Sequence, residues 1–286
     1  MKIKPLDSRN KMAIHECIME KPLLNIFLIE RLLHGNIQSF GLEEWHGVFV
    51  DDQLIAISFS GGRKKPSSPA KLFTGTGSLE SCALIAEFQK SRGGFEIAIG
   101  EDQWIQSILD CVAVPTQFNF SQDYMTNTIS SFSEAIDSNT DSNHIEIATM
   151  KDFDVIYKNS GLMIEEDLGY NPCETESEHQ KNTIKKRIED QRILIGKHEK
   201  HIVFQIEIGV ILPIGCQVGS TYVPREFRGL KYSTKYMREV CRYLFTKTES
   251  VNLHVHIDNH PALRCYKKNG FEKIANYRLA KCKQQR

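Results

Sequence analysis

The sequence has no excess of charge of either sign and no long apolar run. Its 286 residues include 36 Lys and Arg and 36 Asp and Glu, which gives a formal net charge of zero. Without a basic excess, no bulk field attracts nucleic acid or an anionic membrane. No stretch approaches the roughly 18 apolar residues of a membrane span, and the N-terminus lacks the apolar core of a signal peptide. We therefore expect a cytoplasmic protein with no nucleic-acid or membrane partner.

The sequence also lacks paired cysteine motifs. Its eight cysteines are scattered and form no C-x-x-C, which excludes a zinc ribbon or a thioredoxin-like site and favours reduced, buried thiols. His254 and His256 share one face of a predicted strand, and His260 follows it. Such spacing can hold a metal, but apart from Asp258 no nearby ligand completes the set. We expect no metal.

The composition is that of an ordinary globular protein, with 41% apolar and 25% charged residues. The length fits one large domain or two of about 140 residues. Residues 121–143 are rich in Ser, Asn, Asp and Thr, as expected of an inter-domain connection. We predict an α/β (α+β) protein with a domain at 1–129, a linker at 130–143 and a second domain at 144–286.

The first domain shows a mixed pattern of strands and helices. Two β-type runs flank Asp51-Asp52-Gln53, which predicts a hairpin. The run 61–69 is a loop by composition. The other predicted elements are a strand at 2–4, helical segments within 14–33, 79–89 and 104–112, and a strand at 95–99.

The second domain is predicted to follow the order β-α-α-β-β-β-α-β-α-β. Its centre is the stretch Tyr222–Ser233, where a strand ends at Pro224 and an amphipathic helix begins near Gly229. Such a junction presents unpaired backbone N–H groups and a positive helix end to an anion. The first turn contains Lys231, which is unfavourable at a helix N-terminus unless a phosphate binds there.

Two motifs in this domain resemble the GNAT acetyltransferase superfamily. The run Arg228-Gly229-Leu230-Lys231-Tyr232-Ser233 is similar to the family's Arg/Gln-x-x-Gly-x-Gly/Ala, with Lys231 in place of the central glycine and Ser233 in place of Gly/Ala. The run from Asn259 to Phe271 matches Asn-x-x-Ala-x-x-x-Tyr-x-x-x-Gly-Phe at every defined position. The resemblance covers about residues 200–275 and is topological over 1–140. It implies a GNAT-like mixed sheet in the C-terminal half and a degenerate GNAT-like N-terminal half.

The resemblance implies acetyl-CoA as co-substrate and direct transfer to an amine, either a small molecule or a protein or peptide amine. It places Tyr266 where a tyrosine protonates the departing thiolate; a core tyrosine is the alternative. A backbone N–H near Tyr222–Val223 would polarise the thioester carbonyl, although plain sheet pairing is equally consistent. The positions expected to bind the cofactor are Tyr222, Val223, Arg228, Gly229, Leu230, Lys231, Tyr232, Ser233 and Asn259.

The amine arrives protonated, so a base has to remove its proton. Glu207 is the first candidate because it interrupts an apolar strand, where an unpaired carboxylate is costly. The alternation of its strand also permits a solvated face. Glu165, Glu166 and Asp167 lie in a predicted loop where the family forms its acceptor site, and we expect them to attract the amine; a charged surface loop is the alternative.

Two other functions fit the same sequence. A non-catalytic acyl-CoA-binding or regulatory protein is suggested by Lys231 and Ser233 in the phosphate turn. An aminoacyl transferase is suggested by tandem GNAT-like proteins, but the neutral charge weighs against it. The chain ends soon after the strand at 271–279, so we expect the N-terminal half or the segment 121–143 to supply the missing last strand. The sequence does not decide the acceptor, the acyl chain length or the oligomeric state.

Overall fold

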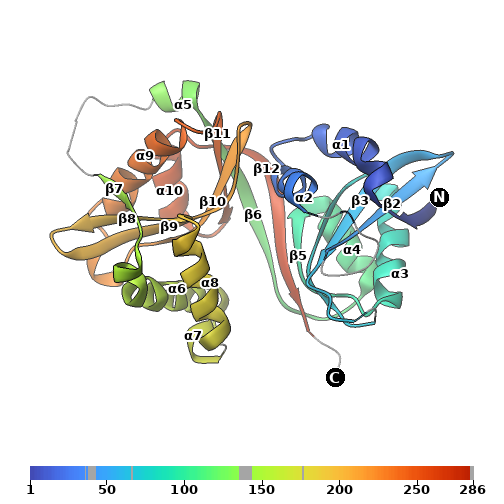
Figure 1. Cartoon of the computed structure of the whole chain (residues 1–286), viewed down its shortest axis with the longest axis horizontal. Coiled ribbons are helices and arrows are strands. Elements are labelled where there is room, and N and C mark those ends of the chain that lie inside the picture. The colour runs from blue at the N-terminus through green and yellow to red at the C-terminus, as the bar shows by residue number, and fades with distance from the viewer. Residues whose placement is uncertain (36, 38–42, 66, 135–143, 176, 284–286) are drawn as a thin grey trace. The chain divides into compact units, whose positions relative to one another are not determined.

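The chain forms two compact units, which Figure 1 shows in a computed structural model. The structure describes residues 1–35, 37, 43–65, 67–134, 144–175 and 177–283. Unit 1 comprises Met1–Tyr124 and Lys273–Arg286, and unit 2 comprises Met125–Glu272. The expected division at 129 and 144 differs from these units, because the C-terminal strand belongs with the N-terminal residues. Of the expected linker, residues 135–143 lie outside the described part, and residues before them form α5 (Ile129–Glu134).

Unit 1 is a mixed sheet with helices on both faces. The strands follow the order β1-β2-β3-β4-β5-β12-β6. The strands are β1 (Lys2–Pro5), β2 (Glu43–Val50), β3 (Gln53–Gly61), β4 (Ala70–Gly77), β5 (Phe95–Glu101), β6 (Thr116–Thr128) and β12 (Glu272–Cys282). The helices are α1 (Lys11–Met19), α2 (Ile26–His34), α3 (Cys82–Ser91) and α4 (Asp102–Val112).

Most of the predicted elements of unit 1 are present. The β2–β3 hairpin turns at Asp51 and Asp52, whose φ angles of 47° and 64° suit a two-residue turn of the type that matches strand twist. The single helical stretch expected within 14–33 is divided into α1 and α2. Strand β4 was not predicted, because its Thr- and Gly-rich sequence has weak alternation. The buried Phe73 of β4 stacks on Phe95 and Trp104, and this packing holds β4 in the sheet.

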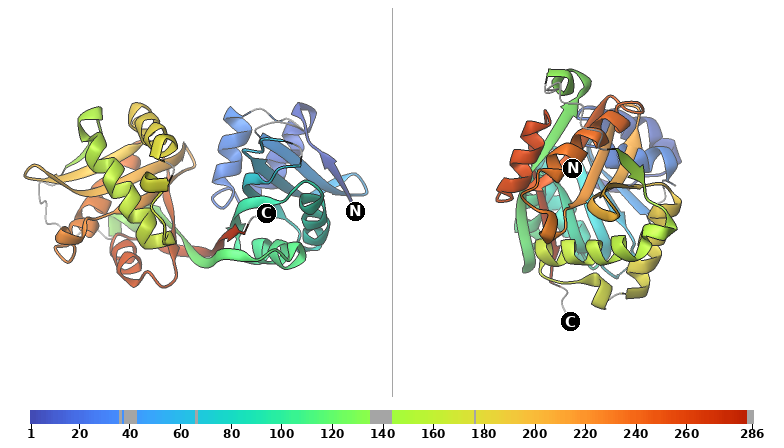
Figure 2. Two further views of the ribbon diagram at one scale, coloured as in Figure 1. Left: turned by 90° about the horizontal axis from the view of Figure 1, so that it is seen from below. Right: turned by 90° about the vertical axis from the view of Figure 1, so that its left-hand side faces the viewer.

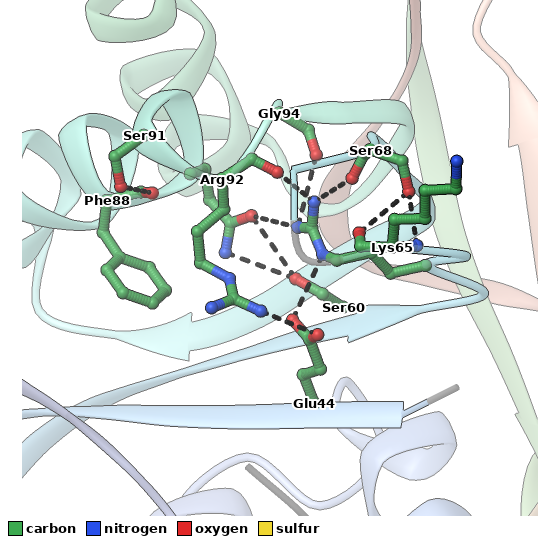
Figure 3. A network of polar contacts seen from close by, with 10 residues as sticks. Glu44, Ser60, Lys65, Ser68, Phe88, Ser91, Arg92 and Gly94 are labelled. Atoms are coloured by element: carbon green, nitrogen blue, oxygen red, sulfur yellow. Dashed lines mark hydrogen bonds and ion pairs between the residues drawn. The ribbon is translucent and has the colours of Figure 1, made fainter. Parts of the chain in front are cut away.

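A buried polar network joins β2, the loop after β3 and the end of α3 in unit 1 (Figure 3). The side chains of Arg63 and Glu44 are 1% and 3% exposed, and their Nε and Oε2 atoms are 3.2 Å apart. Arg63 also donates to the carbonyls of Ser68 and Arg92. Arg92 Nη2 lies 2.8 Å from the other oxygen of Glu44. Burying these charges is tolerated because each has hydrogen-bond partners.

Unit 2 has a sheet in the order β6-β11-β10-β9-β8-β7, to which β6 contributes its last residues. The strands are β7 (Ile145–Ile147), β8 (Ile193–His198), β9 (His201–Leu212), β10 (Gly215–Tyr222) and β11 (Ser250–His256). The helices are α6 (Phe153–Leu168), α7 (Pro172–Thr175), α8 (Ser177–Glu189), α9 (Tyr232–Leu244) and α10 (His260–Lys268).

The helices of unit 2 form two layers. In the left view of Figure 2, the lime α6 and yellow α8 lie on one side of the sheet, and the orange α9 and red α10 lie on the other. The apolar face of α9 buries Tyr236, Met237 and Val240 against Phe204 and Ile206 of β9. On the other face, α6 and α8 bury Ile156, Ile184 and Ile188 against β8. Both faces of β9 are therefore covered.

The missing last strand of unit 2 comes from the segment that the sequence suggested. Residues of β6 lie next to β11, while β12, which follows α10, joins β5 in unit 1 with Tyr277 opposite Glu101. In unit 2, Asn127 of β6 donates to the Asn269 carbonyl at 2.6 Å. Gly270 takes a φ of 86° beside Ser131, a conformation that favours glycine. Of the two sources that the sequence left open for this strand, the N-terminal half and the segment 121–143, the structure has residues of the segment at this edge.

Candidate functional site

The candidate site lies where the parallel strands β10 and β11 end in unit 2. Their register pairs Cys216–Val218 with Val251–Leu253, yet β10 continues to Tyr222. On its other side, β10 carries an irregularity between Gly219 and Tyr222, and Ser220 there has a φ of 51°. A bulge of this kind bends a strand and re-aims its side chains. Ligands of open α/β sheets bind at the carboxyl ends of parallel strands.

The turn after β10 has the geometry of an anion site. Pro224 ends the strand because it has no N–H to donate. Gly229 and Lys231 have φ angles of 80° and 63°, and α9 starts at Tyr232. Lys231 thus holds the left-handed conformation that suits glycine, where the family has its central glycine. A Cβ at Gly229 would meet no atom within 4 Å, so the backbone of the turn is open to a ligand.

The other residues of the turn that were predicted to bind the cofactor, Leu230, Tyr232 and Ser233, differ in exposure and in contacts. Leu230 is exposed, and the first turn of α9 contains no acidic residue. The Tyr232 ring packs near Phe227 and His198. The Ser233 side chain lies close enough to the Cys265 thiol of α10 to act on the pKa of that thiol. The expected contact of Ser233 with the cofactor stays a prediction.

Arg228 joins the turn to α6. Its Nε donates to the Val223 carbonyl at 2.9 Å, and its Nη2 lies 2.7 Å from Glu166 Oε2. Arg225 Nε binds the other oxygen of Glu166 at 2.8 Å. Burial acts to raise the pKa of Glu166, but the hydrogen bonds from both arginines lower it. The Arg228 side chain is thus engaged within the protein, and the expected contact of this residue with the cofactor stays a prediction.

The acidic cluster lies on a helix rather than in a loop. Glu165, Glu166 and Asp167 form the last turn of α6, which runs on to Leu168 through the residues that were expected to form a loop. The expectation of a loop was wrong because Gly169, with a φ of 77°, ends the helix only at that position. Partial desolvation, and then the neighbouring Glu166 carboxylate, raise the pKa of Asp167.

A cavity of about 340 Å³ separates α6 from the end of β10. Two of the three predicted acceptor-binding carboxylates, Glu165 and Glu166, line it, as does Tyr222. Asn159 and Tyr222 are buried, at 5% and 4% exposed. The remaining lining residues are Lys158, Leu162, Pro224, Arg225 and Glu226. The volume suits a small molecule.

Tyr266 lies on α10 next to β10. It is buried, packs on Phe271 with the ring centroids 5.6 Å apart, and lies close enough to the Thr221 side chain for that hydroxyl to act on its pKa. Burial raises the pKa of Tyr266, while the Thr221 hydroxyl acts in the opposite direction. The Asp167 carboxylate also raises it, so Asp167 lies within electrostatic reach of the phenol. A neutral phenol is a hydrogen-bond donor at the carboxyl end of β10.

Asn259 caps the helix that presents Tyr266. Its side-chain oxygen accepts from the Ala262 N–H at 3.2 Å, and Pro261 stands in the first turn, as is usual at helix starts. The structure thus gives Asn259 a structural contact. Its expected contact with the cofactor remains a prediction.

Glu207 is buried on the face of β9 that α6 and α8 cover. It accepts from Arg187 of α8, and the Ser220 hydroxyl at the bulge of β10 lies close enough to act on its pKa. Burial raises the pKa of Glu207, while Arg187 and Ser220 act to lower it. The solvated face left open by the alternation of β9 does not exist. Sequence reasoning missed Arg187, Thr221, Lys158 and Asn159, because their partners come from distant strands and helices.

In unit 1, aromatic side chains pack beside the corresponding pair of parallel strands. Its parallel strands β4 and β5 precede α3 and α4, but Trp104 stacks on Phe73 with ring centroids 5.8 Å apart. A Cβ added at Gly75 would lie 2.5 Å from the Trp104 ring. The first turn before α3 contains Glu80 and no basic residue. The start of α3 in unit 1 thus lacks a basic residue comparable to Lys231 at the start of α9 in unit 2.

The described residues contain no candidate metal site. No group of three or more His, Cys, Asp and Glu has the geometry of a metal site. Burial lowers the pKa of His254 to about 3, so this imidazole is uncharged at neutral pH. Within the same described ranges, no helix is both long and apolar enough to cross a bilayer.

Comparisons with known proteins point to one superfamily. Residues 162–271 match the model of the acetyltransferase (GNAT) family. The fold is similar to that of a GCN5-related N-acetyltransferase from Sphaerobacter thermophilus (TM-score 0.66, 13% identity, 98% of this chain and 94% of that chain). It is also similar to a GNAT-family acetyltransferase from Colwellia psychrerythraea (TM-score 0.57, 12% identity, 99% and 100%).

A tandem GNAT protein of the clavulanic acid biosynthesis pathway aligns with the whole chain (TM-score 0.55, 12% identity, 100% of this chain and 99% of that chain). Identities this low establish the shared fold and no shared substrate. A search of curated proteins gave no match.

Proposed function

The chain is a member of the GNAT superfamily, and from this premise we propose that it transfers an acetyl group from acetyl-CoA directly to an amine acceptor. Acyl transfer is the general chemistry of the family. The observation that best supports the proposal is the pairing of an open anion-binding turn with a buried tyrosine at the end of the same strand. Thr221 of β10, a few residues before the turn begins, lies close enough to Tyr266 to act on the pKa of its phenol.

The turn has the features needed to hold a pyrophosphate. Backbone N–H groups of Gly229–Ser233 precede and begin α9, where the helix dipole favours an anion. Lys231 adds a cation at the same point. Acetyl-CoA, when bound, supplies the acyl thioester, and an exposed strand edge at residues 219–222 of β10 suits an extended arm through backbone hydrogen bonds.

Tyr266 is proposed to protonate the departing thiolate. A thiol of ordinary pKa, ~8.5, leaves as a thiolate that accepts a proton from a neutral phenol. Because burial raises the pKa of Tyr266, its phenol keeps its proton throughout the neutral and mildly alkaline range.

Glu207 is proposed to accept the proton of the incoming ammonium, directly or through water. Its raised pKa brings the carboxylate closer to neutrality, which makes it a better proton acceptor. Ser220 links it to the bulge of β10, next to Thr221 and the Tyr266 phenol. The alternative role of Glu207 is a structural ion pair with Arg187.

The proposal is tested by calorimetric titration with CoA and by measuring thiol release from acetyl-CoA with a panel of amines. We expect CoA to bind, and Tyr266→Phe to lower kcat by about 10²-fold or more while CoA affinity stays unchanged. Tyr243→Phe on α9, whose hydroxyl accepts from Lys247 at 2.8 Å, is the matched control and should keep full activity. Absence of CoA binding at millimolar concentrations would refute the proposal.

One observation favours a second function, that of a non-catalytic acyl-CoA-binding protein. Lys231 holds a left-handed conformation in the turn, and its side chain adds bulk where the family has glycine. Binding of acetyl-CoA without turnover on any amine, and without an effect of Tyr266→Phe, would favour this function over catalysis.

A further inference from the structure

The cavity beside α6 contains donor and acceptor groups at opposite ends. We propose that its occupant is an aliphatic amino acid in which several methylene groups separate the carboxylate from the reacting amine. This inference rests on the proposed function and specifies the acceptor of the same site. Its basis is the order of side chains that α6 presents to the cavity.

The lining residues of α6 follow one helical stripe. Lys158, Asn159, Leu162, Glu165 and Glu166 occupy positions i, i+1, i+4, i+7 and i+8. At a rise of about 1.5 Å per residue, Lys158 and Glu165 lie about 10 Å apart along the helix axis. One wall of the cavity therefore runs from a cation through an apolar side chain to a carboxylate.

The first end of the wall provides hydrogen-bond donors. Among the described residues, no carboxylate lies within ion-pair distance of Lys158. Asn159 is 5% exposed, and its side-chain Nδ2 is buried without a hydrogen-bond partner in the described structure. Buried polar groups are ordinarily paired, so this amide of a lining residue has a donor left for an acceptor group of a ligand. A carboxylate fits both the ammonium of Lys158 and this amide.

The other end attracts an amine. Glu166 is already bound by two arginines, whereas the contact of Glu165 is a long one, 3.5 Å from the Asn171 Nδ2. Both lie in the last turn of α6, where the helix dipole favours a cation. The Asp167 carboxylate in the same turn acts on the Tyr266 phenol. The amine end is thus the end nearer the proposed proton donor.

Leu162 lies between the two ends and suits a methylene chain. A diamine would bring a second cation to Lys158 and be repelled there. A simple alkylamine would leave both Lys158 and Asn159 unpaired. An amino acid satisfies both ends of the wall.

The test compares the binding of 6-aminohexanoate, hexylamine and 1,5-diaminopentane to the full chain with CoA present, by calorimetry. We expect 6-aminohexanoate to bind at least about tenfold more tightly than the other two, as one charge-assisted hydrogen bond allows. Lys158→Met should abolish this preference, Lys158→Arg should keep it, and Asn159→Asp should weaken the binding of 6-aminohexanoate. Lys151→Met, at an exposed lysine outside the cavity, is the control.

Equal binding of the three probes, or a preference that survives Lys158→Met, would overturn the inference. Failure of all three to bind at about 10 mM would overturn it too, because a weak site in this range is detectable. A failure of the proposed function would give a different result. 6-Aminohexanoate would still bind more tightly than the other two probes in a Lys158-dependent way, but no amine would release thiol from acetyl-CoA.

Discussion

Arg228 and Glu166 connect the turn after β10 to the last turn of α6, which lines the cavity, with Nη2 and Oε2 2.7 Å apart. The same guanidinium holds the Val223 carbonyl at the end of β10. One side chain therefore fixes the last turn of α6 against the point where the strand leaves the sheet. Arg225 reinforces this link from the other oxygen of Glu166.

Glu166→Gln should reduce stability by about 1 kcal/mol at pH 7, the upper range of partly exposed ion pairs. Because the two arginines lower the pKa of Glu166 below 4.5, its contribution is present above that value. It is lost as pH falls through the lowered folded-state pKa. Urea unfolding of both proteins should show the difference at pH 7 and a smaller one at about pH 3. Glu165→Gln is the control, and an unchanged difference at low pH would contradict the assignment.

Lys231→Gly should be more stable than Lys231→Ala by about 1 kcal/mol, because position 231 has a φ of 63° and a Cβ is strained there. Both substitutions remove the ammonium. If it contacts a phosphate, both should weaken CoA binding severalfold and reduce its salt dependence. Thermal unfolding and calorimetry at two salt concentrations measure the two effects. Equal stability of the two variants would show that the turn does not hold the left-handed conformation.

Glu207→Gln should lower kcat by about 10²-fold or more if Glu207 is the base. The wild-type rate should fall at acid pH through a pKa above the usual value of glutamate, because protonated Glu207 accepts no proton. Arg187→Met removes a group that lowers this pKa, so it should move the acid limb to higher pH. Lys186→Met, an exposed neighbour on α8, should leave the profile unchanged. If Arg187→Met does not move the acid limb of the pH–rate profile, that limb reports the titration of a group other than Glu207.

Glu44→Gln should destabilise unit 1 by about 3 kcal/mol or more, because it leaves the buried Arg63 and Arg92 charges without a carboxylate. The pKa of Arg63 is already lowered by burial. Lys64→Met next to Arg63 is exposed and should change stability little. Chemical denaturation monitored by the fluorescence of Trp45 and Trp104, both in unit 1, measures the effect. A decrease in the free energy of unfolding below about 1 kcal/mol would show that the Glu44 carboxylate is not needed to stabilise the two arginines.

Local sequence determined the elements of unit 2 and the turn at its centre. The helical period of α9, the proline after β10 and the capping pair Asn259–Pro261 each act over a few residues, so they are readable from the sequence. The resemblance of two motifs then gave the superfamily. The same local signals placed Tyr266 on a helix next to the turn.

Tertiary structure decided what those residues touch. The buried face around Glu207 exists because α6 and α8 cover β9, and the alternation of one strand cannot show what packs on it. The division of the chain into units depended on β12 pairing with β5, more than 170 positions apart. Lys158 and Asn159 became part of a cavity only because α6 extends to Leu168 beside the end of β10. Long-range pairing and packing set these contacts, and no local period in the sequence encodes them.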